Sequence, residues 1–268
     1  MDIINYNNFT DNDLNNKFIN AQPIPHIQIL NFLEKDFFSK FQEIEIDKQK
    51  KKSGIYFNSV VEEKKWISKN TNLPNLTQKL IDELNSEKFI QTLKKITGMK
   101  DLFSTTVGNT DLANYHEMEP GGLLGPHVDH ASDPKSNLPH VLNIVVYLTK
   151  DWDLKWGGGT DFYDFKGKKI ISEVPYIPNS AILFLHTPYS FHGVRRISNE
   201  ANKVRKSLYV DYYSYNLDPY KNFKLNFKNH WFHHGTNFIM SNPINLLRKK
   251  NLLYLKIKIE YFFNKVFN

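Results

Sequence analysis

The stretch Gly125-Pro126-His127-Val128-Asp129-His130 decides the fold of this chain. Residues two apart in an extended strand point to the same face of a sheet, so His127 and Asp129 project together. Val128 then turns into the opposite layer. An isolated His-x-Asp is a weak signal, because it is more often a solvated strand end than a site. The weight of this pattern therefore comes from the segments that follow it along the chain.

A second histidine lies in Ser190-Phe191-His192-Gly193-Val194. His192 is so distant from His127 in sequence that it must come from another strand brought alongside. Gly193 permits a turn or a close approach of two backbones at that point. Two imidazoles and one carboxylate on one side of an ion form the facial triad of non-haem iron(II) sites, which leaves coordination positions open. We therefore predict that His127, Asp129 and His192 bind one Fe²⁺ ion and are the catalytic residues.

The order of these motifs resembles that of the iron(II)- and 2-oxoglutarate-dependent dioxygenases, in their prolyl 4-hydroxylase-like branch. The resemblance depends on Tyr147-Leu148-Thr149-Lys150-Asp151-Trp152-Asp153, on Gly157-Gly158-Gly159 and on Arg205-Lys206-Ser207-Leu208. It covers roughly residues 100–216 and extends more weakly back to about Ile24. It implies a double-stranded β-helix, a jelly-roll variant of the cupin-like kind. The expected fold class is mainly β with N-terminal helices.

The resemblance also implies a reaction. Members of the family decarboxylate 2-oxoglutarate oxidatively with O2, giving succinate and CO2, and hydroxylate an aliphatic C–H bond. Ascorbate is a further expected cofactor. A prolyl residue in a protein or peptide is the best-known substrate of the family, but similar cores act on free amino acids and other small molecules. An oxygenase acting on a sugar or lipid is one alternative, and a non-catalytic jelly-roll binding module is another. The complete ligand set argues against the binding module.

The cosubstrate site follows from the same resemblance. The far carboxylate of 2-oxoglutarate needs a buried cation, and a guanidinium binds a carboxylate through two parallel hydrogen bonds. We predict that Arg205 supplies this cation; Lys206 is the rival, but strand alternation places it on the face of the packing residue Leu208. Tyr147 matches the strand tyrosine that helps to hold the 2-oxoglutarate carboxylate. Tyr115 matches an upstream tyrosine of the family, and a core-packing role is equally compatible with it.

The remaining histidines and arginines of this block have no place in the motif order. We interpret four histidines as ordinary residues: His116, His130, His140 and His186. Of these, His130 is a candidate contact to the substrate or to a ligand residue. Arg195 and Arg196 follow His192 so closely that we expect them at the turn, as a solvated pair.

Composition and charge restrict the classes of partner. The chain has no cysteine, so any metal must use histidine and carboxylate ligands. Its formal net charge of +7 arises in residues 218–268, since the acidic and basic residues of 1–217 balance. The neutral core argues against nucleic acid as a partner. The N-terminus has no apolar stretch typical of a secretory signal, and no apolar run is long enough for a membrane span, so we expect a cytoplasmic protein.

Three segments are predicted along the chain. Residues 1–22 form a polar N-terminal segment that we expect to pack poorly. Residues 23–217 form the dioxygenase domain, with its catalytic core at about 100–216. Residues 218–268 form a basic, aromatic C-terminal extension, which we expect to pack on the core. The alternative for this extension is binding to a membrane surface or to an acidic partner.

The spacing of apolar residues predicts helices before the core and strands within it. A strand is expected over Pro23–Leu30, followed by a helix over Phe32–Glu43 that Asn31 caps. Two further helices, backing one sheet, are predicted over Leu76–Leu84 and from Ser86 to Gly98. Later strands are expected at residues 112–118, 143–149, 160–165, 170–174, 181–185 and 207–213. A turn is expected at Pro120-Gly121-Gly122, and a tight turn or bulge at Gly157-Gly158-Gly159.

Overall fold

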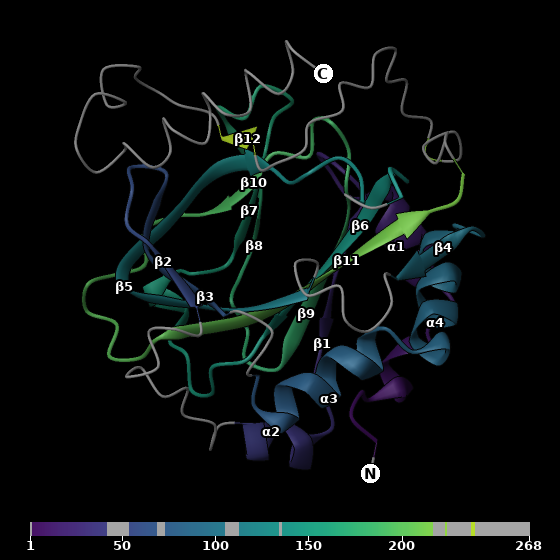
Figure 1. The fold of residues 1–268 in the computed structure, drawn as a ribbon, viewed down its shortest axis with the longest axis horizontal. Coiled ribbons are helices and arrows are strands. Elements are labelled where there is room, and N and C mark those ends of the chain that lie inside the picture. Colours follow the sequence, from purple (N-terminus) through teal and green to yellow (C-terminus); the bar gives the residue numbers. More distant parts are fainter. Residues whose placement is uncertain are drawn as a thin grey trace.

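The structure, a computed structural model, describes residues 2–41, 54–68, 73–104, 113–133, 136–216, 223 and 237–238. Figure 1 shows the elements in chain order. The helical elements are η1 (Tyr6–Phe9), α1 (Leu14–Asn20), α2 (Lys35–Phe41), α3 (Asn75–Leu84), α4 (Glu87–Thr97) and η4 (Leu154–Trp156). The strands are β1 (His26–Leu30), β2 (Gly54–Phe57), β3 (Glu62–Ser68), β4 (Leu102–Ser104), β5 (Ala113–Val128), β6 (His140–Tyr147), β7 (Thr160–Tyr163), β8 (Ile170–Val174), β9 (Ser180–Leu185), β10 (His192–Val194), β11 (Arg205–Ser214) and β12 (Asn237–Phe238).

The named strands pair antiparallel in one strongly curled sheet with the order β1-β9-β6-β11-β5-β10-β7-β8. The long strand β5 connects its two halves. Its first half lies between β11 and β3, with Met118 opposite Arg205, and its second half pairs with β10, with His127 opposite His192. A strand that passes from one layer to the other closes the sheet on itself, as in a jelly roll. The architecture is mainly β and is consistent with the predicted double-stranded β-helix.

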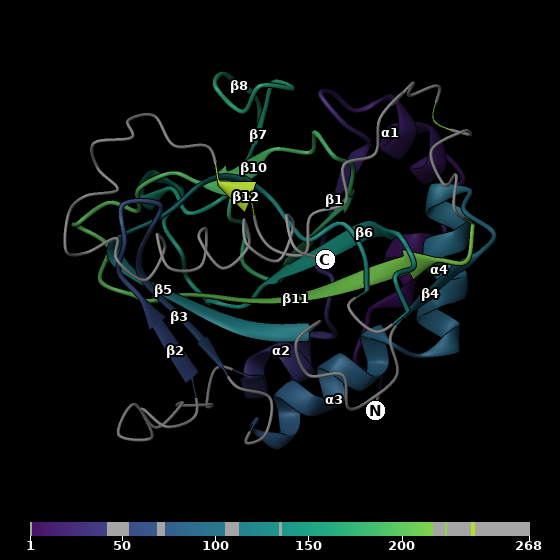
Figure 2. The same ribbon diagram turned by 45° about the horizontal axis from the view of Figure 1, so that its top comes forward.

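Helices cover one face of the sheet. The inward residues of α4 are Phe89, Leu93 and Ile96, and they share a core with Ile144 and Val146 of β6. Figure 2 shows α3 on one side of the layer formed by β11 and β5, with β7 and β8 on the other side and α4 beside the end of β11. The predicted backing role of these helices is therefore confirmed.

The predicted ends of α4 are also observed. The Ser86 side chain accepts a hydrogen bond from the backbone N–H of Phe89, and Gly98 ends the helix at φ +73°. Each of these residues satisfies backbone groups that the helix leaves unpaired at that end.

The opposite face of the same strands forms a second apolar layer. Tyr147 of β6 and Phe184 of β9 pack there with Phe162 of β7, Val174 of β8 and Tyr176. Alternate residues of β6 thus serve different cores, because successive side chains of a strand point to opposite faces. The candidate site described below lies on the face of this second layer.

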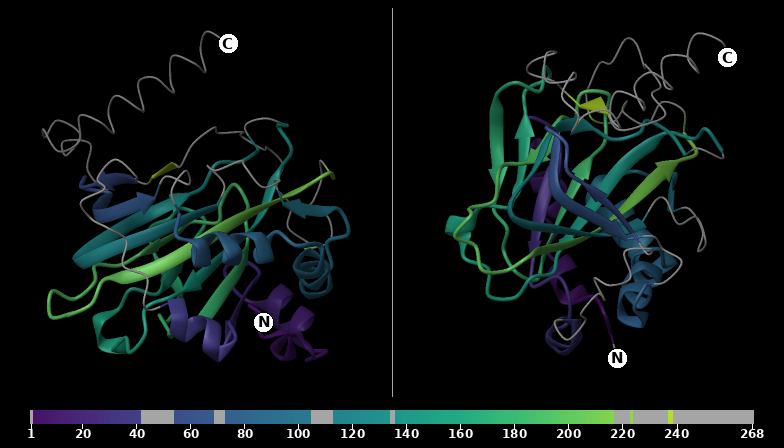
Figure 3. Two further views of the ribbon diagram at one scale, coloured as in Figure 1. Left: turned by 60° about the horizontal axis from the view of Figure 1, so that its bottom comes forward. Right: turned by 60° about the vertical axis from the view of Figure 1, so that its left-hand side comes forward.

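The expected loose packing of residues 1–22 is wrong. Ile4 and Phe18 are fully buried in the helical core, and Ile4 forms a β-bridge with Leu33. The Asn15 side chain donates to the carbonyl of Ile96 at the end of α4. Figure 3 shows this segment, in purple, folded beside the helices. Apolar residues spaced among asparagines are sufficient to anchor it.

The predicted helix cap at Asn31 is also wrong. Asn31 has φ +48°, and the helix begins only at Lys35. The backbone N–H groups of Phe32 and Leu33 instead donate to the carbonyl and side chain of Asn179, which holds this segment extended. A tertiary contact therefore overrides the local helical pattern.

The predicted turn at Pro120-Gly121-Gly122 is part of the continuous strand β5. Strand β3, which the sequence analysis did not predict, runs alongside, and its register slips between Glu63 and Lys65. Gly121 has φ +79°, which accommodates the irregularity without reversing the chain.

The prediction for the C-terminal extension falls outside the described residues, apart from Phe223, which packs against the helical core, and the backbone pairing of β12 with β5. Among the described residues, no helix is both long and apolar enough to span a membrane.

Candidate metal centre

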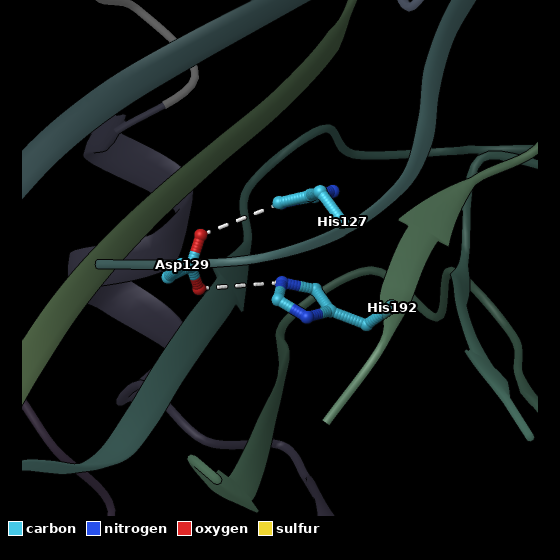
Figure 4. Close-up of side chains that lie close together, drawn as sticks. All are labelled: His127, Asp129 and His192. Carbon is cyan, nitrogen blue, oxygen red and sulfur yellow. Dashed lines mark ion pairs between the residues drawn. The ribbon is translucent and has the colours of Figure 1, made fainter. Parts of the chain in front are cut away.

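The three predicted metal ligands meet at the end of β5. His127 and His192 face each other across β5 and β10, with ring centroids 4.3 Å apart. The two carboxylate oxygens of Asp129 lie 3.4 Å from Nε2 of His127 and 3.4 Å from Nε2 of His192 (Figure 4). Ligand atoms bound to one ion at about 2.1 Å are separated by about 3.0–3.5 Å. The structure therefore brings the three side chains to a spacing that fits a single metal ion.

The ring orientation of both histidines is set by backbone carbonyls. Nδ1 of His127 lies 2.8 Å from the carbonyl oxygen of Gly125, and Nδ1 of His192 lies 3.0 Å from that of Ser190. A carbonyl only accepts, so each Nδ1 carries the proton and each Nε2 presents a lone pair to Asp129. Two nitrogen lone pairs directed at a carboxylate are repelled by its negative charge unless a cation lies between the three groups. This arrangement is typical of metal-binding histidines.

Electrostatics favour the protonation states that a metal requires. Burial, with His127 nearby, lowers the pKa of His192 to about 4, so its ring is neutral at neutral pH. Burial opposes ionisation of Asp129, but attraction by His192 and His127 outweighs it and holds the pKa of the carboxyl well below its usual value. Metal binding needs neutral imidazoles and an ionised carboxylate.

Gly193 allows β10 to approach β5 closely, as predicted. A Cβ atom at this position would lie 2.7 Å from the carbonyl oxygen of Leu124 and 3.1 Å from that of Gly125. Val128 points away from the ligands into a small apolar cluster with Tyr163 and Phe191, also as predicted.

Asn143 is a site residue that the sequence analysis did not identify as one. Its Nδ2 group lies 3.1 Å from Oδ2 of Asp129 and 3.0 Å from Oδ1 of Asp211. The side chain therefore orients the carboxylate of a predicted ligand and links it to a second buried carboxylate. Its presence on β6, two strands away from β5 through β11, could not be read from sequence spacing.

Arg205 is a buried cation with no acidic partner among the described residues. Only 3% of its surface is exposed. Its Nε donates to the carbonyl of Gly158, and one terminal nitrogen donates to Ser207 Oγ at 2.9 Å. Burial lowers the pKa of this guanidinium. A buried charge that the protein leaves unpaired is costly, so the position favours an external anion.

The glycine cluster contributes to this position. Gly158 has φ +81°, and a Cβ atom there would lie 3.3 Å from Cδ of Arg205. The rival cation Lys206 pairs with Glu117, whereas Arg205 pairs with Met118. Adjacent strand residues point to opposite faces, so Arg205 and Lys206 cannot both face the same layer.

Tyr147 lies beside Arg205, as predicted. The guanidinium carbon of Arg205 lies 5.4 Å from the centroid of the Tyr147 ring, and the Tyr147 hydroxyl contacts Thr160 Oγ1 at 2.6 Å. Burial raises the pKa of Tyr147 to about 12, so its hydroxyl keeps its proton. Tyr147 and Asn143 alternate onto one face of β6, about 13 Å apart at the strand rise of about 3.3 Å per residue. The metal ligands and Arg205 therefore lie toward opposite ends of one face.

Tyr115 packs in the helical core, in agreement with the core-packing alternative left open for it. It pairs with Leu208, belongs to the helical core and donates to Glu117 Oε1 at 2.9 Å. The neighbouring His116 occupies the site face instead, opposite Ser207. Its Nε2 atom is buried and makes no hydrogen bond. Burial, with Lys65 and Arg205 nearby, holds the pKa of His116 well below its usual value. β5 is irregular near Gly121, where it pairs with β3, and again between Leu124 and His127, where it pairs with β10. Its alternation is therefore not continuous, which spacing alone did not reveal.

Arg195 and Arg196 lie outside the metal centre. Their side chains are 54% and 49% exposed, as expected for a solvated pair, but each is also ion-paired. Arg195 contacts Asp161 at 2.9 Å, and Arg196 contacts Glu63 at 2.9 Å.

Three of the four histidines interpreted as ordinary form a stacked group. The ring centroids of His130 and His140 are 4.8 Å apart, and those of His140 and His186 are 4.1 Å apart. Nε2 of His186 lies 3.3 Å from the backbone oxygen of Asp129. The fold therefore gathers these three histidines beside the metal ligands, which the motif order did not indicate.

Comparisons with known proteins give one family match and several structures of similar fold. Residues 111–211 match the family model described as the 2OG-Fe(II) oxygenase superfamily. A prolyl-4-hydroxylase from Pseudomonas putida is similar in structure, with a TM-score of 0.51 and 13% identity over 76% of this chain and 100% of that one. A prolyl hydroxylase from Trichoplax adhaerens was solved with a peptide fragment of the hypoxia inducible factor oxygen degradation domain. It has a TM-score of 0.52 and 13% identity over 76% of this chain and 90% of that one.

The same fold occurs with a different activity. SnoN, a non-haem α-ketoglutarate-dependent epimerase from nogalamycin biosynthesis, gives a TM-score of 0.51 and 11% identity over 76% of this chain and 84% of that one. A search of curated proteins found no match to this sequence. At these identities the structural similarities establish the fold alone.

Proposed function

We propose that this chain is a 2-oxoglutarate-dependent dioxygenase that hydroxylates an aliphatic C–H bond of a prolyl residue in a protein or peptide. The match of residues 111–211 to the 2OG-Fe(II) oxygenase family model supports this proposal. Succinate and CO2 are the co-products. The observation that carries the proposal is the buried Arg205, unpaired with any described carboxylate, on the same sheet as a complete set of two histidines and one aspartate.

The donor set fits Fe²⁺. Two neutral imidazoles and one carboxylate on one side of an ion leave room for a chelating cosubstrate and O2. When bound, the iron would activate O2 for its reaction with 2-oxoglutarate. His127, Asp129 and His192 hold the ion, and the carbonyls of Gly125 and Ser190 keep both rings in the tautomer that binds it.

Arg205 and its neighbours hold the far carboxylate of 2-oxoglutarate. Within the buried layer, a guanidinium gains more from a carboxylate than it would in water. The Tyr147 hydroxyl, with its high pKa, remains a hydrogen-bond donor beside that carboxylate. His116 adds a buried ring nitrogen that has no partner in the protein. These groups orient the cosubstrate and exclude water from it.

The prolyl substrate is supported by the kind of proteins that share the fold. Two of the similar structures are prolyl hydroxylases, and one holds a peptide. A small-molecule substrate is the second candidate, because the epimerase SnoN shares the fold to the same extent. A non-catalytic binding module would have no need for an intact ligand set, and the close spacing of His127, Asp129 and His192 supports an enzyme instead.

A turnover assay tests the proposal. The full chain is incubated with Fe²⁺, 2-oxoglutarate, ascorbate and O2, and succinate is measured without substrate, with proline-containing peptides, with matched proline-free peptides and with free amino acids. We expect iron-dependent succinate that increases with proline-containing peptides and is lost in His127→Ala and His192→Ala. Turnover that increases only with free amino acids would support the small-molecule alternative. Full turnover in either histidine variant would remove that residue from the ligand set.

A further inference from the structure

We propose that this protein has a second divalent-metal site, suited to Zn²⁺, formed by His130, His140 and Asp211. These residues are not needed for the proposed hydroxylation, which uses one Fe²⁺. The second site therefore goes beyond that function and does not depend on it.

The three side chains have the spacing of a ligand set. Nε2 of His140 lies 3.4 Å from Oδ1 of Asp211, and Nε2 of His130 lies 3.8 Å from Oδ2 of the same carboxylate. All three ligand atoms lie within 4.8 Å of one another, as in the first centre. Tetrahedral ligands at about 2.0–2.1 Å from Zn²⁺ are about 3.4 Å apart. The carboxylate lies between the two rings, so a modest inward movement of His130 completes the set.

Nε2 of His140 faces the buried carboxylate of Asp211 at a position that suits a bound cation. His140 is fully buried, and its Nδ1 lies 2.8 Å from the carbonyl oxygen of His130. Because a carbonyl only accepts, Nδ1 is the donor. Burial opposes protonation of the ring, but Asp211 outweighs it and raises the pKa of His140, so Nε2 attracts a cation: a proton, or a metal ion that replaces it. That Nε2 is buried and makes no hydrogen bond, although it faces the carboxylate of Asp211. A buried lone pair facing a buried anion is unfavourable unless a cation binds both.

The surroundings orient the ligands as in a metal site. Asn143 donates to Asp211 Oδ1 at 3.0 Å, which fixes the carboxylate. The His130 carbonyl fixes the tautomer of His140, which is the usual support for a metal-binding imidazole. The Tyr213 hydroxyl lies 2.8 Å from Nε2 of His130 and is placed as a further oxygen near the site.

An ion has a route to this position. Asp211 and His140 are 2% and 0% exposed, but the His130 side chain is 20% exposed. Entry from the side of His130 leaves the two buried ligands preorganised, and closing the ring over the ion requires no rearrangement of the strands β6 and β11. Two imidazoles and one carboxylate select borderline divalent ions such as Zn²⁺ over Mg²⁺ or Ca²⁺.

Metal stoichiometry tests the proposal without relying on catalysis. The full chain is stripped with a chelator, equilibrated with Zn²⁺, freed of excess ion by gel filtration and analysed by atomic emission. We expect two Zn²⁺ per chain in the unmodified protein and one in His140→Gln and in Asp211→Asn. His192→Ala also binds one, held by the second site. The double variant His192→Ala/Asp211→Asn binds none.

A neighbouring histidine provides the matched control. His186 stacks on His140 with a centroid distance of 4.1 Å but is not a proposed ligand, so His186→Gln retains two Zn²⁺. Thermal unfolding of each variant verifies that it is folded. If His140→Gln does not fold, His130→Ala, on the exposed side, replaces it and is also expected to bind one ion.

Three results would overturn the proposal. They are one Zn²⁺ per chain in the unmodified protein, two in Asp211→Asn, or an NMR titration showing that a proton on His140 Nε2 occupies the place of the ion at neutral pH. Failure of the proposed function would appear differently, as an absence of succinate formation with both ions bound.

Discussion

The side-chain amide of Asn143 donates a hydrogen bond of 3.1 Å to the carboxylate of Asp129. The same Nδ2 group lies 3.0 Å from Asp211, so one amide on β6 holds two carboxylates that would otherwise repel each other. The orientation of the predicted iron ligand therefore depends on a residue from a different strand.

Replacing Asn143 is expected to weaken iron binding at Asp129. Loss of a residue that orients a metal ligand costs about 10–100-fold in metal affinity. We expect Asn143→Ala to raise the Fe²⁺ concentration for half-maximal succinate formation by about that factor. Val145→Ala, two residues along the same face of β6, is the matched control. An unchanged iron requirement in Asn143→Ala would mean that Asp129 needs no such support.

Arg205→Ala is expected to raise the 2-oxoglutarate concentration for half-maximal turnover far more than Lys206→Ala. Removing one partner of a buried charge pair costs about 2–5 kcal/mol, which is about 30-fold or more in affinity. Arg205→Lys should recover only part of this, because an ammonium lacks the planar fork of a guanidinium. Steady-state succinate formation at varied 2-oxoglutarate measures all three variants. A larger effect from Lys206→Ala would reassign the anchor.

His116→Ala is expected to weaken 2-oxoglutarate binding, whereas Tyr115→Phe is not. The buried Nε2 of His116 has no partner in the protein, and a hydrogen bond to a ligand contributes about 1 kcal/mol, more when the ligand is charged. We expect the 2-oxoglutarate requirement to rise about fivefold to tenfold in His116→Ala. Tyr115→Phe removes only the contact to Glu117 and should lower the unfolding free energy by about 1 kcal/mol. The reverse ranking in the binding assay would return Tyr115 to the site.

Gly193→Ala is expected to destabilise the fold and to separate the two histidines. The added methyl group would lie 2.7 Å from the carbonyl of Leu124, so β10 must move away from β5. Overpacking of this kind costs about 1–3 kcal/mol of unfolding free energy. Iron affinity should fall as well. Gly98→Ala, at the end of α4, should lower stability without changing iron affinity, which urea unfolding and iron titration will compare.

The metal-free protein is expected to gain stability as the pH rises from about 4 to 6.5. The pKa of His192 is about 4 in the folded protein and 6.5 ordinarily, so in this range the unfolded chain binds a proton that the folded chain does not. Each such proton contributes up to about 1.4 kcal/mol per pH unit. The lowered pKa of Asp129 acts in the same direction, but at pH values below about 3.8.

Urea unfolding in chelator at several pH values measures this slope. His192→Gln should have a shallower slope than the unmodified protein between about pH 4 and 6.5, because it lacks the titrating ring. If the unfolding free energies of the variant and the unmodified protein changed with pH at the same rate, His192 would have the same pKa in the folded and unfolded states.

The local sequence pattern was sufficient to predict features that depend only on residues close together in the chain. His127 and Asp129 project together because they are two residues apart in a strand, and Ser86 and Gly98 end a helix through their own side-chain and backbone chemistry. The resemblance of the motif order was sufficient to name the fold and to propose His192 as a ligand, and strand alternation favoured Arg205 over Lys206.

The face on which Tyr115 and His116 lie could not be predicted in this way. The alternation counted back from His127 fails because β5 shifts register between Leu124 and His127 against β10 and again near Gly121 against β3. The same is true of Asn31, whose local pattern favours a helix cap but whose neighbours Phe32 and Leu33 bond to Asn179 from a distant part of the chain.

The local sequence therefore supplies the candidate residues: His127 and Asp129 as metal ligands two positions apart, and Arg205, at the start of a strand, as an anion-binding residue. Only the closing of the sheet brings Asn143 to Asp129 and gathers His130, His140 and Asp211 around a common point. The physical reason is that side-chain direction repeats every two residues only while a strand is regular, whereas contacts between strands depend on register, bulges and the curvature that packing imposes.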